Sequence, residues 1–567
     1  MILLAVLGIF LLIPTVFTDS FSSLVSLQAL IGAERDIPVM INSYVEKELE
    51  RLDHLKKFAQ EVQDRNDKAI RDGEQAVIHP VNAFLLIKEM TADWDRVVYM
   101  MRTNSADDFI RNVTQQRVIK RINYPTEEDL SGAAIGLLRL QDTYRMDTKD
   151  IAEGKVLNSK IRTAALTAGD CFEIGRAAYN AYDYYHTILW MQEARERVEK
   201  EVVPTANLED ILEYLAFSLY KQGNLKRALL LTDELYRLNP DHPRAKGNVK
   251  WYEDLLEDEG VRHIDMRRNI PLINNPRLHD DSEREIFESL CRDEVPVSVK
   301  ALSRLYCYYK MDRPYLRLAP FKVEIAHQNP MAVLIHDIMS DEEARVIEML
   351  SIPLACLIIL RNEICTTKKF HNSVTGNLET ASYRISKSAW LKPTHHEIVE
   401  RINRRLDLAT NLDMETGEDL QVQNYGIGGH YDPHFDCSRR NERDAFKDKA
   451  GNRIATILIY MTEPEIGGGT VFTELKKSVP CTKNAALFWY NLMRSGEVDM
   501  RSRHAACPVV TGMKWVTNKW IHEQGQEWRR PCGLNQFDQE RYVGDLGAPE
   551  PKYYPNIRSE PKKNPKK

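Results

Sequence analysis

The chain has 567 residues, 43% of them hydrophobic and 28% charged, and this length accommodates three or four domains of about 150 residues each. Its 77 Lys and Arg are outnumbered by 83 Asp and Glu, and the net charge of −6 excludes the broad basic surface that nucleic-acid binding requires. With 26 Gly, 25 Pro and 8% aromatic residues, the composition also excludes a collagen-like or globally disordered chain.

An apolar run opens the chain, from Ile2 to Pro14, and small and polar residues follow as far as Ser20. This pattern predicts a signal peptide over residues 1–18, with a buried N-terminal helix as the alternative. No later run reaches the ~18 apolar residues that span a bilayer, so a lumenal or secreted protein without a membrane span is expected. Asn112 opens an Asn-Val-Thr sequon that this route would expose to glycosylation.

Residues 19–146 have a helical pattern with one apolar stripe. The stripe comprises Leu49, Leu52, Leu55, Phe58, Ala59 and Val62. Such a stripe needs a partner helix, and two interpretations remain open: an ordinary helix bundle or an intermolecular coiled coil.

An internal repeat follows, because a shift of 41 positions aligns Gly175 with Ala216 and Tyr179 with Tyr220. The second copy resembles a tetratricopeptide repeat, in which small residues let paired helices approach. Gly223 is expected to end the first helix of this copy and Pro240 to stop the second. Residues 165–255 are therefore predicted to form an α-solenoid.

Tyrosines crowd these repeat helices, and about half of the rings are expected to be core. The others would line a groove suited to polyproline II peptides, whose rings dock with little loss of chain entropy. Tyr182 and Tyr185 lie off the main repeat positions and are the best candidates for exposure, and Tyr220 completes the predicted peptide site.

Residues 256–320 form a polar connector. After it the sequence pattern changes to short runs rich in β-branched residues, separated by turn residues. The predicted strands are 331–335, 421–425, 454–460, 470–472, 485–489 and 515–517, with helices at 341–350 and 396–404. Many short strands indicate an all-β sandwich or barrel over residues 321–532. The basic, Pro-rich tail 533–567 is expected to be disordered.

His434 and Asp436 are two residues apart on one predicted strand, so both side chains leave the same face. A His-x-Asp pair is common by chance, but His504 supplies a second histidine several strands later. Two histidines and one carboxylate form the facial triad that binds non-haem Fe(II) for oxygen chemistry.

Lys514 follows His504 by ten residues, about the length of a turn and a return along the neighbouring strand. A buried lysine is costly without an anionic partner, and the distal carboxylate of an α-keto acid cosubstrate would supply one. A lysine on the solvent face is the alternative.

At this point a family resemblance is clear. The matching stretches are Tyr383–Trp390, Gln423–Gly429, Pro433–Asp436, Gly468–Phe472, Phe488–Leu492, Arg503–Pro508 and Asn518–Glu523. Residues 321–532 resemble the double-stranded β-helix (jelly-roll) domain of 2-oxoglutarate-dependent dioxygenases, specifically that of animal collagen prolyl 4-hydroxylase α subunits. The repeat resembles the peptide-substrate-binding domain of those subunits, and residues 19–146 resemble their helical dimerisation domain.

The resemblance implies an enzyme that hydroxylates proline at C4 in procollagen-like chains, using Fe(II), O2, 2-oxoglutarate and ascorbate. His434, Asp436 and His504 would bind iron, Lys514 would bind the cosubstrate carboxylate, and Tyr425 and Thr456 would lie beside that cosubstrate. The family pairs such a subunit with protein disulfide isomerase, in a tetramer of two α and two β subunits in the endoplasmic reticulum lumen.

The resemblance also implies two disulfides, Cys291–Cys307 and Cys507–Cys532. Two features depart from the family pattern: His430 replaces a glutamine, and the tail after Cys532 is long. Alternatives to the hydroxylase are a catalytically silent procollagen-binding or chaperone subunit and a hydroxylase of lysine or of non-collagen proteins. A zinc hydrolase is disfavoured, because nothing in its chemistry requires Lys514.

Overall fold

The computed structural model describes residues 24–72, 94–102, 110–111, 127–159, 163–277, 282–357, 370–371, 378–379, 386–426, 428–439, 450–535, 538 and 540. The predicted signal peptide, the Asn112 sequon and residues 541–567 of the tail lie outside these ranges. Residues 25–125 form one compact unit and residues 126–567 belong to the other. Among the described helices, none is long and apolar enough to cross a membrane.

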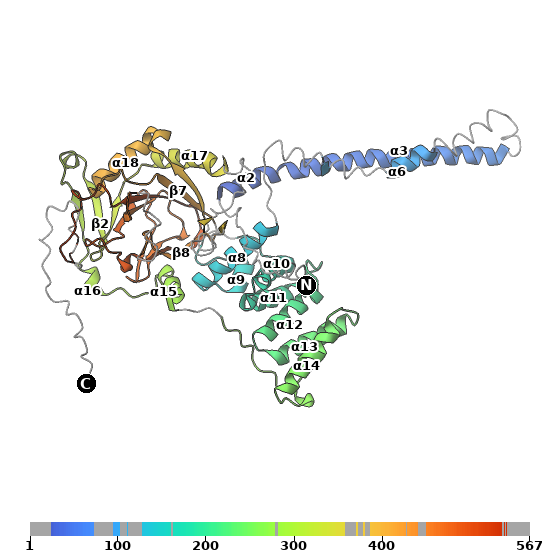
Figure 1. Cartoon of the computed structure of the whole chain (residues 1–567). Coiled ribbons are helices and arrows are strands. Elements are labelled where there is room, and N and C mark those ends of the chain that lie inside the picture. Colours follow the sequence, from blue (N-terminus) through green and yellow to red (C-terminus); the bar gives the residue numbers. More distant parts are fainter. Residues whose placement is uncertain are drawn as a thin grey trace, which may run out of the picture. The chain divides into compact units, whose positions relative to one another are not determined.

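The unit of residues 25–125 is built on one long amphipathic helix (Figure 1). Its helices are α2 (Leu24–Glu34), α3 (Asp36–Asp72) and α6 (Trp94–Arg102). Helix α6 lies along α3, where the Arg51 guanidinium donates to the Met100 carbonyl at 3.0 Å. The stripe on α3 is only partly covered, since Leu49 and Leu52 are 60% and 52% exposed.

The predicted repeat is a stack of antiparallel helices preceded by two others. The helices are α8 (Glu127–Tyr144), α9 (Thr148–Ala152), α10 (Ala168–Asn180), α11 (Tyr184–Val198), α12 (Leu208–Lys221), α13 (Leu225–Leu238) and α14 (Ala245–Asp258). Gly175 allows α10 and α11 to approach closely, because a Cβ there would lie 3.0 Å from the Met191 methyl group. Gly223 has a φ of +78° just after α12, as its predicted role as a helix terminator requires.

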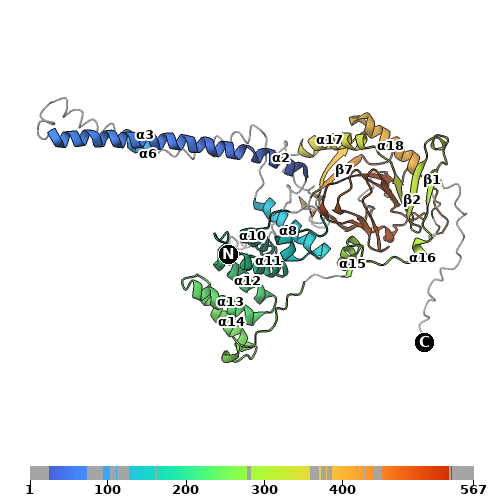
Figure 2. The ribbon, with the colours of Figure 1, turned by 180° about the vertical axis from the view of Figure 1, so that it is seen from behind.

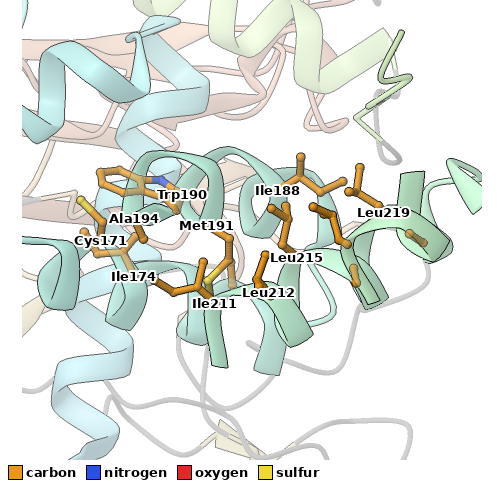
Figure 3. Packing of buried hydrophobic residues seen from close by; sticks show 14 of the residues in the cluster. Cys171, Ile174, Ile188, Trp190, Met191, Ala194, Ile211, Leu212, Leu215 and Leu219 are labelled. Carbon is orange, nitrogen blue, oxygen red and sulfur yellow. The ribbon is translucent and has the colours of Figure 1, made fainter. Parts of the chain in front are cut away.

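The core of the repeat is apolar and continuous across three helices (Figure 3). Trp190 and Met191 on α11 share this cluster with Ile174 of α10 and Ile211 of α12. Trp190 is fully buried and its indole N–H donates to Gln141 of α8 at 2.9 Å. Trp190 is therefore one of the crowded aromatic rings that belong to the core.

The C-terminal part is the predicted antiparallel double-sheet domain. The eight-stranded sheet has the order β1 (Cys307–Lys310), β2 (Phe321–His327), β3 (Ala332–His336), β13 (Ala486–Tyr490), β9 (Arg453–Tyr460), β16 (Lys514–His522), β7 (Leu420–Tyr425), β6 (Lys387–Leu391). The four-stranded sheet has the order β12 (Lys477–Val479), β11 (Thr470–Phe472), β14 (His504–Ala506), β8 (Tyr431–His434). Two pairs complete the strands: β10 (Ile466–Gly467) with β15 (Val509–Thr511), and β4 (Phe370–His371) with β5 (Leu378–Glu379).

Side chains of both sheets share one buried cluster, which includes Tyr460 of β9 and Phe472 of β11. The Tyr460 hydroxyl also bonds Thr470 Oγ1 at 2.8 Å, which joins the sheets through a polar contact. Helices α17 (Asp341–Leu357) and α18 (Glu397–Thr410) flank the larger sheet on the side of β6 and β7 (Figure 2). The shorter helices α15 (Ser282–Cys291) and α16 (Val299–Leu302) precede β1. All six predicted strands and both predicted helices are present and begin within one residue of the predicted starts, but β16, α17 and α18 extend five to seven residues beyond the predicted ends.

Candidate active site

Two side chains from the smaller sheet and one from the segment after β8 converge in one cluster. His434 ends β8, His504 begins β14, and these two residues are direct cross-strand partners. Asp436 follows two residues after His434, beyond the end of β8 rather than on the strand as predicted. Its Oδ1 lies 3.6 Å from His434 Nε2, and its Oδ2 lies 3.5 Å from His504 Nε2. Ligand atoms of all three lie within 4.8 Å of one another, a grouping able to hold a metal ion.

Both histidines are tethered in the same way, through the ring nitrogen that faces away from the cluster. His434 Nδ1 donates to the carbonyl of Asp432 at 2.7 Å, and His504 Nδ1 donates to that of Ser502 at 2.9 Å. Because a carbonyl oxygen only accepts, Nδ1 carries the proton and the Nε2 lone pair faces Asp436. This is the tautomer that a metal ion requires, and the donor set fits Fe(II).

Electrostatics favour the same protonation states. Burial, together with the neighbouring His434, lowers the pKa of His504 to about 4, so its ring is neutral at neutral pH. Burial alone would raise the pKa of Asp436, but His504 and His434 hold that pKa well below its ordinary value. A neutral His504 and an ionised Asp436 therefore lie side by side in this cluster.

Lys514 begins β16 and is 1% exposed, which excludes the solvent-face alternative. Its strand belongs to the larger sheet, whereas His504 lies in the smaller one, so the return strand is not the neighbour that the sequence predicted. The ammonium lies 4.7 Å from the centre of the ring of Tyr425, the residue of β7 that is the cross-strand partner of Lys514. Burial lowers the pKa of Lys514, and no carboxylate among the described residues forms an ion pair with it.

Gly468 makes room for this lysine. Its φ is +76°, and a Cβ there would lie 2.9 Å from Pro464 Cγ and 3.3 Å from Lys514 Cδ. The Cys481 thiol bonds the Gly468 carbonyl at 2.9 Å and fixes this turn. The turn at Gly468 thus forms part of the wall around the Lys514 ammonium, which lacks a counter-ion among the described side chains.

Thr456 is predicted to lie beside the cosubstrate, and in the structure its hydroxyl lies against the carboxylate of Asp436. The distance from Thr456 Oγ1 to Asp436 Oδ2 is 2.8 Å, and both residues are buried. The unusual His430 is also buried and lies beside Asp432, with its Nε2 3.1 Å from Oδ1. Burial lowers the pKa of His430, so a neutral ring precedes the metal-binding strand.

The predicted peptide residues lie on the repeat but not all in one place. Tyr182 is 79% exposed, and Tyr185 is half-buried with its ring against His186. Tyr220 belongs to a row of aromatic rings in mutual contact that spans α10, α11, α12 and α14. The row comprises Phe172, Tyr214, Tyr179, Tyr184, Phe217, Tyr220, Trp251 and Tyr252. Phe217 and Trp251 were missed, although Phe217 lies three residues from Tyr220 on the same helix face.

Both predicted disulfide pairings are wrong in this structure, which joins Cys291 to Cys507. Helix α15 packs on the smaller sheet, where Phe287 and Leu290 contact Val471 and Ala505, so the end of α15 meets the residue after β14. Cys307 and Cys532 are exposed free thiols. Cys171, predicted to be buried, is buried, and so are Cys437 and Cys481.

Two further residues near the cluster were also missed, Trp489 and Asn491 at the end of β13. Asn491 bonds Thr456, and the Trp489 ring lies 4.7 Å from that of His504. The signal was available, because both residues lie in the Phe488–Leu492 motif with the period-2 spacing that puts side chains on one strand face.

Comparison with known proteins agrees with this site. Three family models match: the N-terminal region of the prolyl 4-hydroxylase α subunit over residues 23–158, the prolyl 4-hydroxylase peptide-substrate-binding domain over 168–258, and the 2OG-Fe(II) oxygenase superfamily over 420–522. The chain is 54% identical to prolyl 4-hydroxylase subunit alpha-1 of Caenorhabditis elegans, covering 95% of each chain.

The other relatives are as fully covered. Identity to subunit alpha-2 of Caenorhabditis elegans is 50%, over 96% of this chain and 98% of that protein. Identity to human subunit alpha-1 is 41%, over 94% of this chain and 99% of the human protein. The chain therefore belongs to the prolyl 4-hydroxylase α-subunit family, and its C-terminal domain is a 2-oxoglutarate- and Fe(II)-dependent dioxygenase.

Proposed function

We propose that this subunit hydroxylates proline at C4 in collagen-like, Pro-rich chains. The observation that carries the proposal is the pairing of a convergent His434, Asp436 and His504 cluster with a buried Lys514 that lacks a carboxylate partner among the described residues. A catalytically silent subunit would not need to maintain a buried cation of this cost.

The protein's own groups would each have a defined task. His434 and His504 offer Nε2 lone pairs and Asp436 a carboxylate oxygen, so these three hold Fe(II). The Lys514 ammonium binds the distal carboxylate of 2-oxoglutarate, and the Tyr425 ring walls that pocket. Bound Fe(II), with 2-oxoglutarate and O2, supplies the oxidation in which succinate and CO2 form and one oxygen atom passes to proline. Ascorbate as the reductant rests on the resemblance alone.

The repeat domain would hold the substrate chain away from the reacting proline. Its row of aromatic rings spans four helices and matches the extended form of a polyproline II peptide. Tyr182, Tyr185 and Tyr220 remain proposed contacts, with Phe217 and Trp251 added. A second point of attachment raises the effective concentration of prolines along a long chain.

The family and the predicted signal peptide also support a proposal about the compartment and the partner of this subunit. We propose residence in the endoplasmic reticulum lumen after removal of residues 1–18, glycosylation at Asn112, and assembly with protein disulfide isomerase as the β subunit. The exposed Leu49 and Leu52 of α3 support the further proposal that two α subunits meet through this helix.

The test is a peptide hydroxylation assay on the chain co-expressed with protein disulfide isomerase. With a (Pro-Pro-Gly)n peptide, Fe(II), 2-oxoglutarate and ascorbate, we expect peptide-dependent succinate and a mass gain of one oxygen on proline. His504→Ala should abolish both without unfolding the domain. A complex that holds Fe(II) but forms no succinate with peptide would contradict the proposal and favour a procollagen-binding role. Oxygen found on lysine, or only on other proteins, would reassign the substrate.

A further inference from the structure

A chain of buried hydrogen bonds leads from the strand β13 to the carboxylate of Asp436. The Trp489 indole nitrogen lies 3.0 Å from Asn491 Oδ1, and Asn491 Nδ2 lies 2.9 Å from Thr456 Oγ1. Thr456 Oγ1 lies 2.8 Å from Asp436 Oδ2. Every member is at most 6% exposed, so water does not compete for these bonds.

The direction of this chain is determined by chemistry. An indole N–H only donates, so Asn491 must turn its oxygen to Trp489 and its NH2 group to Thr456. The Thr456 oxygen then accepts from Asn491, and the hydroxyl proton is left to point at Asp436. A run of donors therefore ends on the ionised carboxylate, where a hydrogen bond is strongest.

The strand register puts these groups together. Trp489 and Thr456 are direct partners in the antiparallel pairing of β13 with β9, and Asn491 lies two residues beyond Trp489 on the same face. The backbone of Asn491 is also fixed, because its N–H donates to Ile454 and its carbonyl accepts from Asp499, both at 2.9 Å. The larger sheet thus holds the three donors of this hydrogen-bond chain, whereas Asp436 follows a strand of the smaller sheet.

We propose that Thr456 and Asn491 are positioning residues for the metal: they lock the rotation of the Asp436 carboxylate and occupy a lone pair of Oδ2. Trp489 extends this role to the second histidine, since its ring packs against His504 at 4.7 Å between centroids. Without the chain, Asp436 would be free to rotate away from the two imidazoles. The inference rests on the proposed function in taking the cluster as the iron site.

The experiment is a titration of the metal-free complex with Co(II), followed by its visible absorption. Thr456→Val keeps the shape and removes the donor, and we expect a Co(II) affinity about 10- to 100-fold weaker. Thr456→Ser, which keeps the hydroxyl, should restore the wild-type affinity, and Asn491→Leu should weaken binding by a smaller factor. Thr517→Val is the matched control, because the Thr517 hydroxyl is fully buried without a hydrogen-bond partner among the described residues.

One result would overturn the inference: a wild-type Co(II) affinity in folded Thr456→Val. If the KM of that variant for 2-oxoglutarate is also raised, Thr456 is assigned to the cosubstrate instead. The proposed function fails separately: a wild-type complex that binds Co(II) but forms no hydroxyproline when loaded with Fe(II) contradicts the activity, while the comparison of affinities still decides the role of Thr456.

Discussion

Two lysines are equally buried in the catalytic domain, at 1% exposure each, and their surroundings differ completely. Lys310 donates to Asp312 Oδ1 at 2.6 Å, to the Leu408 carbonyl at 2.8 Å and to Asn411 Oδ1 at 3.2 Å. Lys514 has the Tyr425 ring and no carboxylate among the described residues. The first is a completed structural ion pair, whereas the second is the cation that we propose binds the distal carboxylate of 2-oxoglutarate.

Replacing each lysine by methionine should separate these roles. Lys514→Met removes an uncompensated buried charge, so we expect the free energy of unfolding without cosubstrate to rise by roughly 1 to 3 kcal/mol while activity falls at least 100-fold. Thermal unfolding with and without 2-oxoglutarate measures this, and only the wild type should be stabilised by the cosubstrate. Lys310→Met should lower the free energy of unfolding by about 3 kcal/mol, because it leaves the Asp312 carboxylate without its ion-pair partner. A destabilised Lys514→Met would contradict the assignment.

At the scale of residues, the sequence predicted the candidate site residues but not the disulfide pairing. The convergence of His434, Asp436 and His504 and the burial of Lys514 were predictable, because the proposed reaction requires all four side chains. The cysteines were not, since a disulfide depends on which surfaces pack together, and the contact of α15 with the smaller sheet puts Cys291 beside Cys507.

At the scale of elements, the turn between β7 and β8 is held against helix α8. Gly428 has a φ of +68°, and a Cβ there would lie 2.7 Å from the Gly136 carbonyl of α8. Arg139, one turn further on, donates to the Gly428 carbonyl at 2.9 Å. The turn leads directly into the strand that ends at His434, so α8 helps to fix the start of the metal-binding strand.

Gly428→Ala should therefore be costly. Strain from the positive φ adds about 1 kcal/mol, and overlap with backbone atoms that cannot rotate away adds more, so we expect a loss of roughly 2 to 4 kcal/mol and reduced metal affinity. Gly496→Ala is the control, because its φ is +84° but nothing lies within 4 Å of the added carbon. Chemical denaturation of both variants measures the difference; equal losses would show that α8 exerts no steric constraint.

The strands themselves were predictable because β-branched runs and turn residues are local signals. Their distribution between the two sheets was not, as Lys514 shows: spacing predicted a neighbouring strand, yet β16 pairs with β7 and β9 in the opposite sheet. The position of Asp436 past the end of β8 likewise depends on where pairing stops, which period-2 alternation does not reveal.

At the scale of the whole molecule, an ionic cluster ties together α8, α11 and α15. Asp142 of α8 lies 3.0 Å from His186 Nε2 and 3.2 Å from the Arg284 guanidinium, and Asp183 lies 2.6 Å from His186 Nδ1. Burial alone would lower the pKa of His186, but hydrogen bonds to Asp142 and Asp183 raise it to about 9. His186 is therefore a buried cation at neutral pH.

This cation predicts a pH dependence of stability. The pKa of His186 is higher in the folded state than its unfolded value of 6.5, so its contribution is complete below pH 6.5 and is lost as the pH rises through about 9. The total is on the order of 3 kcal/mol. Thermal unfolding of the wild type should thus shift downward between pH 7 and 9.5 more than that of His186→Asn. Parallel profiles would contradict the charged state.

The stripe on α3 makes a prediction about assembly. Leu49 and Leu52 are more than half exposed, so a charge at both positions costs the described unit little and should remove an apolar contact with another chain. We expect Leu49→Glu with Leu52→Glu to halve the mass of the complex by light scattering while activity on a short peptide persists. Glu46→Lys, on the same helix, serves as a charge-change control. An unchanged mass would favour the bundle interpretation.

The matching tethers on His434 and His504 have a further consequence for the life of the enzyme. Each ring is held by a carbonyl two residues upstream on its own chain segment, a constraint that owes nothing to the ion. An enzyme molecule that has lost its iron to a chelator therefore keeps the rings of His434 and His504 in the orientation that binds metal. We therefore expect Fe(II) to bind the metal-free enzyme again without a slow refolding phase. Metal-free enzyme should regain activity as soon as Fe(II) is supplied.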